Sequence, residues 1–223
     1  MVIVSRVWDG RYFLEIQGSY LFSCPHGSLK GVIALIESEK IIQALCYVLQ
    51  RVKKADKLKL VKLLYLADKY HILRYGRTVT GDEYWAMDYG PVGSITKDIL
   101  SLDKDMLSRE YQPANRLLKK AGKHDFVVGG ACTDDDLDLL SETDREAIDF
   151  VAERFGRLTS SQLVDYTHRY PEWAQYKELF ADRITKRQRI ETEELISFLD
   201  DDCMAVPEEH LEESKKLMSG IFL

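Results

Sequence analysis

Tyr65, Asp68, His71 and Tyr75 are the residues of this chain whose types and spacing could support acid–base chemistry. Side chains three or four positions apart share one face of a helix, so these four would line up if residues 57–75 are helical. A carboxylate beside an imidazole can transfer protons, and Asp68 with His71 could then serve a hydrolase. The alternative, which we favour, is a buried hydrogen-bond network that satisfies polar groups on a core helix.

Two further groups of residues have the types that bind metals, but each lacks the rest of a site. Cys24 and His26 could bind zinc, yet no second pair with zinc spacing follows. Four aspartates within residues 134–138 could bind calcium, yet the turn glycine and distal glutamate of a calcium loop are missing. The phosphate-binding glycine loop, the nucleophile elbow and the zinc-protease motif are missing as well. We therefore expect no metal and no cofactor, and we predict that the chain is not an enzyme.

Thr167, His168 and Trp173 form a cluster that could also be taken for a catalytic one. A helix that begins at the capping box Thr159–Gln162 must end before Pro171, which places the cluster at the end of that helix. We favour a structural role, in which Trp173 covers the domain and His168 is hydrogen-bonded beneath it.

The element that positions the acid–base candidates is the segment 57–75, which is apolar on nearly every face. A helix of this kind must lie at the centre of a domain. Lys59, Lys62 and Lys69 are expected to form a narrow solvent-facing stripe along it. Gly76 is well placed to end the helix.

A short aromatic segment with a Gly-Pro turn follows the central helix. Glu83–Tyr89 alternates enough to be a strand, and we expect Tyr84 to pack the small sheet onto the central helix. Ser94–Leu102 is predicted to be the next helix. We expect Pro91 and Val92 to stand at its start and to leave backbone donors of its first turn pointing outward.

The remaining elements follow from periodicity and turn residues. A hairpin is predicted at residues 2–22, because the Asp9–Gly10 dipeptide favours a tight turn between strands. Further elements are helices at 38–52, 143–156 (with the capping box Thr143–Glu146), 159–170, 190–199 and 207–220, a strand at 124–128 and a basic connection at 185–189. The predicted fold class is α+β, mainly α: a helical domain around a buried central helix with a small antiparallel sheet, plus an N-terminal β-hairpin extension.

We divide the chain into an N-terminal hairpin extension (1–37), a main domain (38–180) and a C-terminal helical extension that packs on the same domain (181–223). No apolar run approaches the roughly 20 residues that a membrane-spanning helix needs. The amino terminus lacks the layout of a secretory signal. We therefore expect a cytoplasmic protein without a membrane partner, in which the four cysteines are free thiols.

The net charge of −6 hides an asymmetry between a middle part, residues 39–123, with +7 and a later part, residues 124–223, with −13. A basic strip opens the central helix and could contact phosphates; it consists of Lys53, Lys54, Lys57, Lys59 and Lys62. That helix is too apolar to read bases in the major groove, so weak DNA binding stays a secondary expectation.

Several short motifs follow one another in a fixed order across roughly residues 39–180. They are Lys59-Leu-Val-Lys62-Leu-Leu-Tyr65, Asp68, Gly76, Tyr84-Trp85-Ala86, Tyr89-Gly90-Pro91-Val92, Thr167-His168 and Trp173. In this order they resemble the Panacea domain, the SocA-like antitoxin domain of bacterial and phage toxin–antitoxin systems. We take Lys59, Lys62, Tyr65, Asp68, His71, Tyr84, Thr167, His168 and Trp173 as the structural residues of this signature.

The resemblance implies an antitoxin that binds and neutralises a toxin encoded beside it, and for some relatives the delivery of that toxin to a protease. Interfaces favour aromatic anchors, so the expected partner-binding residues are Trp85, Tyr89, Gly90, Pro91 and Val92. Two alternatives stay open: a DNA-binding regulator of its own operon, and a hydrolase that uses Asp68 and His71. The oligomeric state is left open.

Overall fold

The computed structural model describes residues 3–8, 11–16, 19–24, 29–101, 112–130, 132–199 and 201–220. The chain divides into two units, residues 1–36 and 37–223. In the first unit, β1 (Ile3–Trp8), β2 (Arg11–Ile16) and β3 (Ser19–Cys24) form an antiparallel sheet in that order, which confirms the predicted strands. The predicted Asp9–Gly10 turn, His26 and the side chain of Cys24 lie outside what the structure describes.

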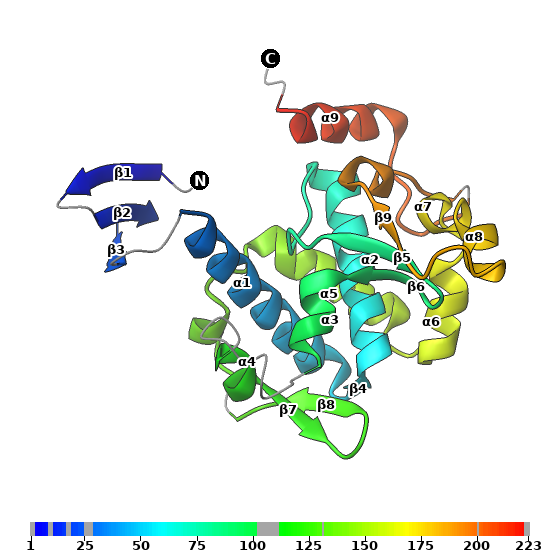
Figure 1. Cartoon of the computed structure of the whole chain (residues 1–223), viewed down its shortest axis with the longest axis horizontal. Helices are drawn as coiled ribbons and strands as arrows, with labels where there is room; N and C mark the ends of the chain where they lie inside the picture. The colour runs from blue at the N-terminus through cyan, green and yellow to red at the C-terminus, as the bar shows by residue number, and fades with distance from the viewer. Residues whose placement is uncertain are drawn as a thin grey trace. The chain divides into compact units, whose positions relative to one another are not determined.

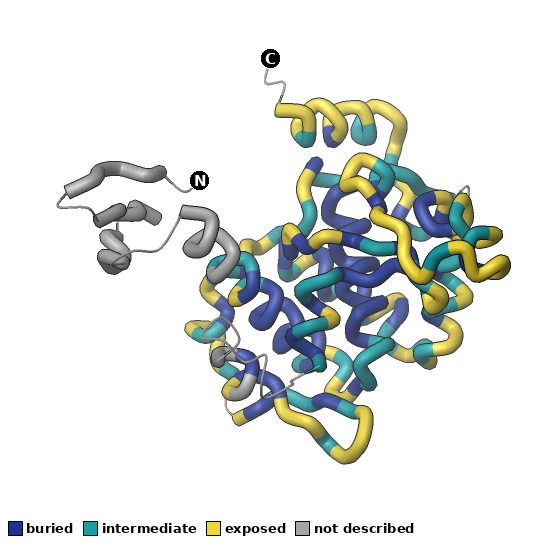
Figure 2. Tube along the Cα trace, in the orientation of Figure 1, coloured by how far each residue is buried: buried dark blue, intermediate teal, exposed yellow. Residues whose placement is uncertain are grey.

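The second unit is built around α2 (Lys57–Tyr75), whose predicted central position is confirmed (Figures 1 and 2). The helix begins after Asp56, whose carboxylate accepts a hydrogen bond from the backbone N–H of Lys59 at 3.0 Å. It ends at Gly76, which has the left-handed φ of 66° that glycine adopts without steric cost. The elements of the second unit that pack against α2 in the described residues include α3, α5, α6, α9, β4, β6 and η3.

The other helices differ widely in length. They are α1 (Leu29–Val52, of which residues 37–52 belong to the second unit), α3 (Ser94–Ile99), α4 (Gln112–Leu117), α5 (Glu142–Phe155), α6 (Ser160–Thr167), α7 (Pro171–Ala174), α8 (Lys177–Ala181) and α9 (Glu208–Met218), with 3-10 turns η2 (Asp134–Leu137) and η3 (Thr192–Leu195). The capping box Thr159–Gln162 is confirmed at the start of α6. The box predicted at Thr143–Glu146 is wrong, because Ser141 and Asp144 cap α5 one half-turn earlier.

Two small antiparallel sheets complete the second unit, so the predicted mainly helical α+β class is confirmed. One sheet has the order β4 (Ala55–Asp56), β8 (Asp125–Val128), β7 (Leu118–Ala121). The other has the order β6 (Gly90–Gly93), β5 (Tyr84–Met87), β9 (Gln188–Ile190) and lies over α2 (Figure 1).

The strand β9 corrects the prediction for residues 185–199. The sequence predicts a basic connection followed by a helix, but Gln188–Ile190 pairs with β5, where Ile190 stands opposite Tyr84. Ile190 is thereby buried, and only the short turn η3 remains of the predicted helix. Pairing with a strand about one hundred positions away overrides the local helical pattern.

The left-handed glycine that ends α2 gives a stability prediction. A Cβ at Gly76 would lie 2.5 Å from the carbonyl oxygen of Ser214 in α9, whereas a Cβ at Gly81, with a similar φ of 69°, would meet nothing within 4 Å. Gly81→Ala should therefore cost about 1 kcal/mol, the conformational penalty alone. Gly76→Ala should cost roughly 3 kcal/mol, because it adds a clash with α9.

Urea unfolding of the two variants beside the parent chain measures this difference. Equal losses of unfolding free energy in Gly76→Ala and Gly81→Ala would show that α9 does not pack tightly on the end of α2.

Candidate functional site

The buried carboxylate of Asp68 is a centre of hydrogen bonds between α2 and the segment that leads into β5. It accepts hydrogen bonds from the backbone N–H groups of Val79 (2.9 Å) and Thr80 (3.0 Å) and from the hydroxyl of Tyr84 (2.7 Å). The Thr80 hydroxyl donates as well. Burial raises the pKa of Asp68 to about 6, although these donors lower it. Tyr84 is buried and packs β5 onto α2, as its sequence position predicts.

His71 is equally buried and bonds to other elements. Its Nδ1 lies 2.7 Å from the carbonyl oxygen of Arg77, and its Nε2 lies 3.0 Å from the hydroxyl of Thr143 at the start of α5. Burial lowers the pKa of His71 to about 4, so the ring is neutral near pH 7. Both acid–base candidates are fully shielded from solvent and hydrogen-bonded to protein groups, which matches the structural interpretation.

The two tyrosines that flank this pair bond elsewhere. The hydroxyl of Tyr65 donates to Glu172 in α7, and the hydroxyl of Tyr75 donates to Glu146 in α5 at 2.8 Å. The face predicted to carry one network therefore connects α2 to several different elements.

The lysines of α2 correct the prediction of a solvent-facing stripe. Lys62 and Lys69 have no exposed surface, because each amine finds acceptors inside the protein. Lys69 pairs with Glu172 at 2.6 Å and also donates to the carbonyl oxygen of Leu195 at 3.1 Å. Lys62 donates to the carbonyl oxygen of Pro91 at 2.7 Å, and burial lowers its pKa to about 7.

Lys59 is half-buried and closes the end of α5. Its amine donates to the carbonyl oxygens of Gly156 (2.6 Å) and Leu158 (2.8 Å), which have no partner within the helix. Lys59 and Lys62, two of the five lysines predicted to contact DNA phosphates, are thus engaged in hydrogen bonds within the protein. The other three, Lys53, Lys54 and Lys57, stay at least partly exposed.

Side chains of the signature residues Lys62, Thr167 and Trp173 pack under the turn between β5 and β6. Gly90 has a φ of 93°, and a Cβ there would lie 2.6 Å from the amine of Lys62 and 2.9 Å from the hydroxyl of Thr167. Glycine suits this position because L side chains rarely adopt such a φ and because the side chains of Lys62 and Thr167 lie so close. The indole N–H of Trp173 donates to the carbonyl oxygen of Met87 at 2.8 Å and holds the other side of the turn.

His168 stacks flat on Trp173, with ring centroids 3.5 Å apart and an interplanar angle of 3°. Its Nε2 is buried and has no hydrogen-bond partner, so the predicted hydrogen bond of His168 is wrong. The stack fills the space under the turn through ring contact instead.

The start of α3 corrects a further prediction. Residues 90–93 form β6, and the first donors of α3, the backbone N–H groups of Ile95 and Thr96, bond to the carboxylate of Asp82 at 2.9 and 2.8 Å. A Cβ at Gly93 would lie 2.4 Å from that carboxylate, so glycine there admits Asp82. These donors therefore point inward, where the sequence predicts that they point outward.

The five residues predicted to bind a partner lie in different surroundings. Tyr89, at the tip of the turn, is 66% exposed. Trp85 is half-buried, with the guanidinium of Arg187 at 4.5 Å from its ring centroid. Gly90 and Pro91 are buried, and Val92 is exposed by only 8% at the edge of a groove.

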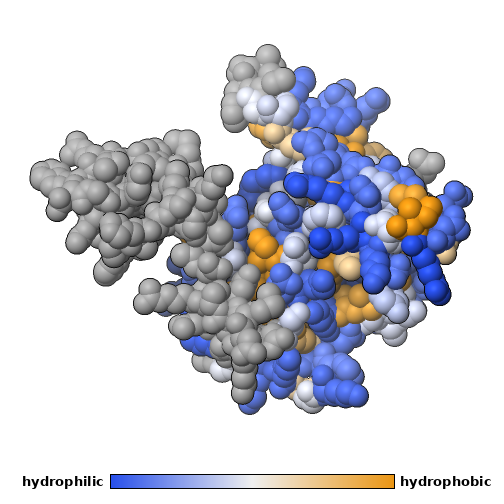
Figure 3. Space-filling model, in the orientation of Figure 1, coloured by the Kyte–Doolittle hydropathy of each residue, from blue (hydrophilic) through white to orange (hydrophobic). Residues whose placement is uncertain are grey.

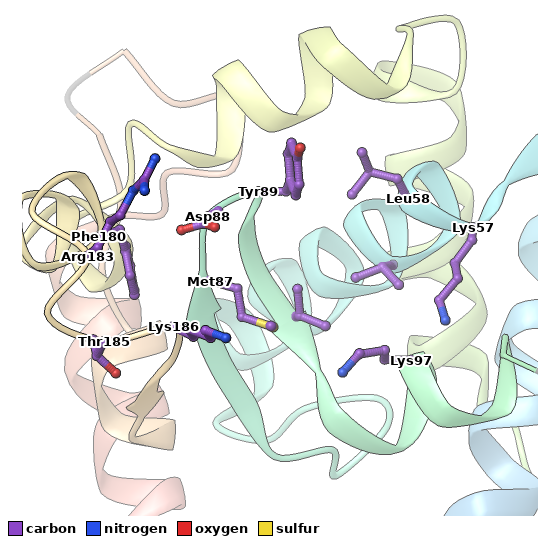
Figure 4. A pocket seen from close by; sticks show the side chains of 12 residues that line it. Lys57, Leu58, Met87, Asp88, Tyr89, Lys97, Phe180, Arg183, Thr185 and Lys186 are labelled. Atoms are coloured by element: carbon purple, nitrogen blue, oxygen red, sulfur yellow. The ribbon is translucent and has the colours of Figure 1, made fainter. Parts of the chain in front are cut away.

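This groove has a volume of about 810 Å³ and lies between the β5–β6 hairpin, the start of α2, α3 and the segment after α8 (Figure 4). Its surface is mainly apolar and comes from Leu58, Val61, Met87, Val92 and Phe180, with Tyr89 at one end. The surrounding face of the molecule is largely hydrophilic, with small hydrophobic areas (Figure 3).

Sequence reasoning missed groove residues outside the hairpin, among them Lys97, Phe180, Arg183 and Lys186. The available signal was the basic run that begins at Arg183, which encloses an apolar residue, Ile184, that is 69% exposed.

The described part of the chain holds no cluster of three or more His, Cys, Asp or Glu side chains arranged to bind a metal ion. Within the same residues, no helix combines the length and the hydropathy needed to cross a membrane.

Comparison with known proteins gives one match. A family model described as "Antitoxin SocA-like, Panacea domain" matches residues 60–174, slightly more than half of the chain. The matched region contains nearly all of α2, the β5–β6 hairpin and the α6–α7 segment, and thus most of the residues described above. No curated protein and no solved structure matches the chain.

The burial of Lys62 predicts a pH dependence of stability. Its pKa falls from 10.5 in the unfolded chain to about 7 in the fold, so between these pH values the unfolded state binds more protons. The contribution of Lys62 to the unfolding free energy should therefore rise with pH across this window, and it is lost progressively as the pH falls back to about 7. Lys62→Met has no titrating amine, so its stability relative to the parent chain should drop by about 3 kcal/mol between about pH 7 and about pH 10.

Urea unfolding of both proteins at several pH values measures the difference, in which the effects of all other groups cancel. A difference that stays constant with pH would mean that the Lys62 amine keeps its ordinary pKa in the fold.

Proposed function

Because this chain belongs to the antitoxin SocA-like, Panacea domain family, we propose that it neutralises a cognate toxin, encoded beside it, by direct protein–protein binding. We place the contact at the β5–β6 turn and the groove beside it, and the activity in the cytoplasm.

The observation that carries this proposal is the exposed Tyr89 at the tip of a hairpin whose base is hydrogen-bonded to α2 and α7. Lys62 and Trp173 bond to backbone carbonyls on the two strands, and the Asp68 carboxylate accepts from Tyr84. An exposed tyrosine on such a support costs little conformational entropy when a partner binds it. Aromatic side chains of this kind dominate the binding energy of many interfaces.

The burial of the signature residues Asp68 and His71 supports a binding role over catalysis. A catalytic carboxylate or imidazole must reach substrate, whereas Asp68 and His71 are fully buried and hydrogen-bonded to the fold. Delivery of the bound toxin to a protease would follow the same binding step and is compatible with the proposal. Regulation of the operon through DNA has less support, because Lys59 and Lys62 bond to internal carbonyls.

Truncation of Tyr89 tests the proposed contact. Tyr89→Ala should weaken binding of the neighbouring gene's product by about tenfold or more, because it removes the aromatic anchor. The matched control is Leu217→Ala on α9, which removes another large apolar side chain that is 49% exposed. Titration calorimetry with the purified partner measures both, and growth rescue on co-expression shows the effect in cells.

Binding that Tyr89→Ala and Leu217→Ala leave equally strong would place the interface elsewhere on the protein. A wild-type chain that fails to bind the neighbouring product would refute neutralisation of that protein.

A further inference from the structure

The charges around the groove are strongly biased toward one sign. Four cations, Lys57, Lys97, Arg183 and Lys186, line it together with a single carboxylate, Asp88 (Figure 4). Three of the four cations are well exposed, and Lys57 is half-buried. Within the described residues, none of the four forms an ion pair. The groove therefore presents an apolar floor under a rim with a net positive charge.

The positive charges near this groove affect the pKa of Lys57. Burial lowers the pKa of Lys57, and the nearby Lys97 and Lys120 lower it further against the opposing effect of Asp98. The amine of Lys57 donates to the hydroxyl of Ser101 at 2.7 Å, which is a neutral partner. A carboxylate brought to this end of the groove would relieve the repulsion between the lysines.

Arg183 adds an observation that is independent of charge. It follows α8 in the left-handed conformation, with a φ of 56°, where glycine is the usual residue. The N–H of Arg183 bonds to the carbonyl oxygen of Phe180 and the N–H of Ile184 to that of Leu179, which is the Schellman pattern of a helix end. An arginine at this position carries backbone strain that glycine would avoid. Backbone strain of this kind clusters at active sites and ligand-binding segments.

The apolar surface also continues beyond the cavity. Tyr89 at one end and Ile184, between the groove residues Arg183 and Thr185, are the two most exposed large apolar side chains after residue 36 in the described chain. A small molecule seated in the groove would leave such flanking side chains in water, whereas a protein surface would cover them. Nucleic acid would match the cations but not the apolar floor.

We propose that this groove receives a segment of the cognate toxin in which an apolar side chain is flanked by aspartate or glutamate residues. The inference rests on the proposed function and adds to it the chemistry of the partner segment. The apolar side chain lies against Val61, Val92 and Phe180, and the acidic residues face Lys97, Arg183 and Lys186.

Charge reversal at the rim tests this pairing in the full chain. The triple variant K97E/R183E/K186E should weaken binding of the neighbouring gene's product by about thirtyfold or more, since it turns attraction into repulsion. The control K119E/R154E/K216E changes the net charge equally at exposed residues outside the groove, and it should alter binding by no more than about twofold. Synthetic peptides that tile the toxin should compete only where an apolar residue is flanked by acidic ones.

Arg183→Gly provides a second variant with an opposite effect on stability. Removal of the strained side chain should raise the melting temperature, yet it should weaken toxin binding by about fivefold through the lost cation. A purely structural role of Arg183 would leave binding unchanged or improved.

Three outcomes would overturn the inference. Binding that survives K97E/R183E/K186E at full strength would refute the groove while leaving neutralisation intact. If K97E/R183E/K186E loses the wild-type chain's binding to duplex DNA from the upstream region but still binds the toxin as before, the rim would be assigned to nucleic acid. Absence of any complex between the wild-type chain and the neighbouring product would refute the proposed function and the inference together.

Discussion

The constraint on which this structure depends is that the stretch of α2 that is buried on every side, residues 60–73, must satisfy its polar side chains inside the protein. A buried amine, carboxylate or imidazole without partners would cost several kcal/mol. Four such groups on α2, Lys62, Asp68, Lys69 and His71, are fully buried. Each is satisfied by a different part of the chain, so the hydrogen bonds of one helix fix the positions of the elements around it. Apolar packing alone tolerates alternative arrangements more readily.

The hairpin of β5 and β6 gains most from this arrangement. It is bonded to α2 through Tyr84 and the carbonyl of Pro91, and to α7 through the carbonyl of Met87. These bonds hold its base, while the turn at its tip stays accessible at Tyr89. The signature residues can therefore serve both folding and binding. The buried polar residues hold the hairpin, and the turn at its tip presents the surface proposed to contact the toxin.

The sequence predicted the features that depend on local patterns. Burial of α2 follows from its apolar periphery, its end from Gly76, and the start of α6 from the Thr159–Gln162 capping box. The partners of the buried lysines could not be predicted, because Lys69 and Glu172 are 103 positions apart and only the folded chain brings them together. A lysine on an apolar helix ordinarily faces solvent. The acceptor that allows it to be buried is distant in the sequence and cannot be recognised from the residues around the lysine.

The candidate site shows the same limit. Tyr89 and Val92 were found from the aromatic turn, whereas Phe180 and Arg183 complete the groove from a segment about ninety positions later. The strand that follows them, β9, pairs with β5 and replaces part of a locally predicted helix. Sequence motifs do not predict a binding surface that is assembled from distant segments, even when one of these segments carries the family signature.

Hydrogen–deuterium exchange of the full chain, alone and in complex with the product of the adjacent gene, tests the central claim most directly. Exchange should slow on binding in residues 57–61, 87–93 and 179–187, while α5 and the β7–β8 strands should exchange as before. A stable complex whose protection is confined to other parts of the chain would contradict it.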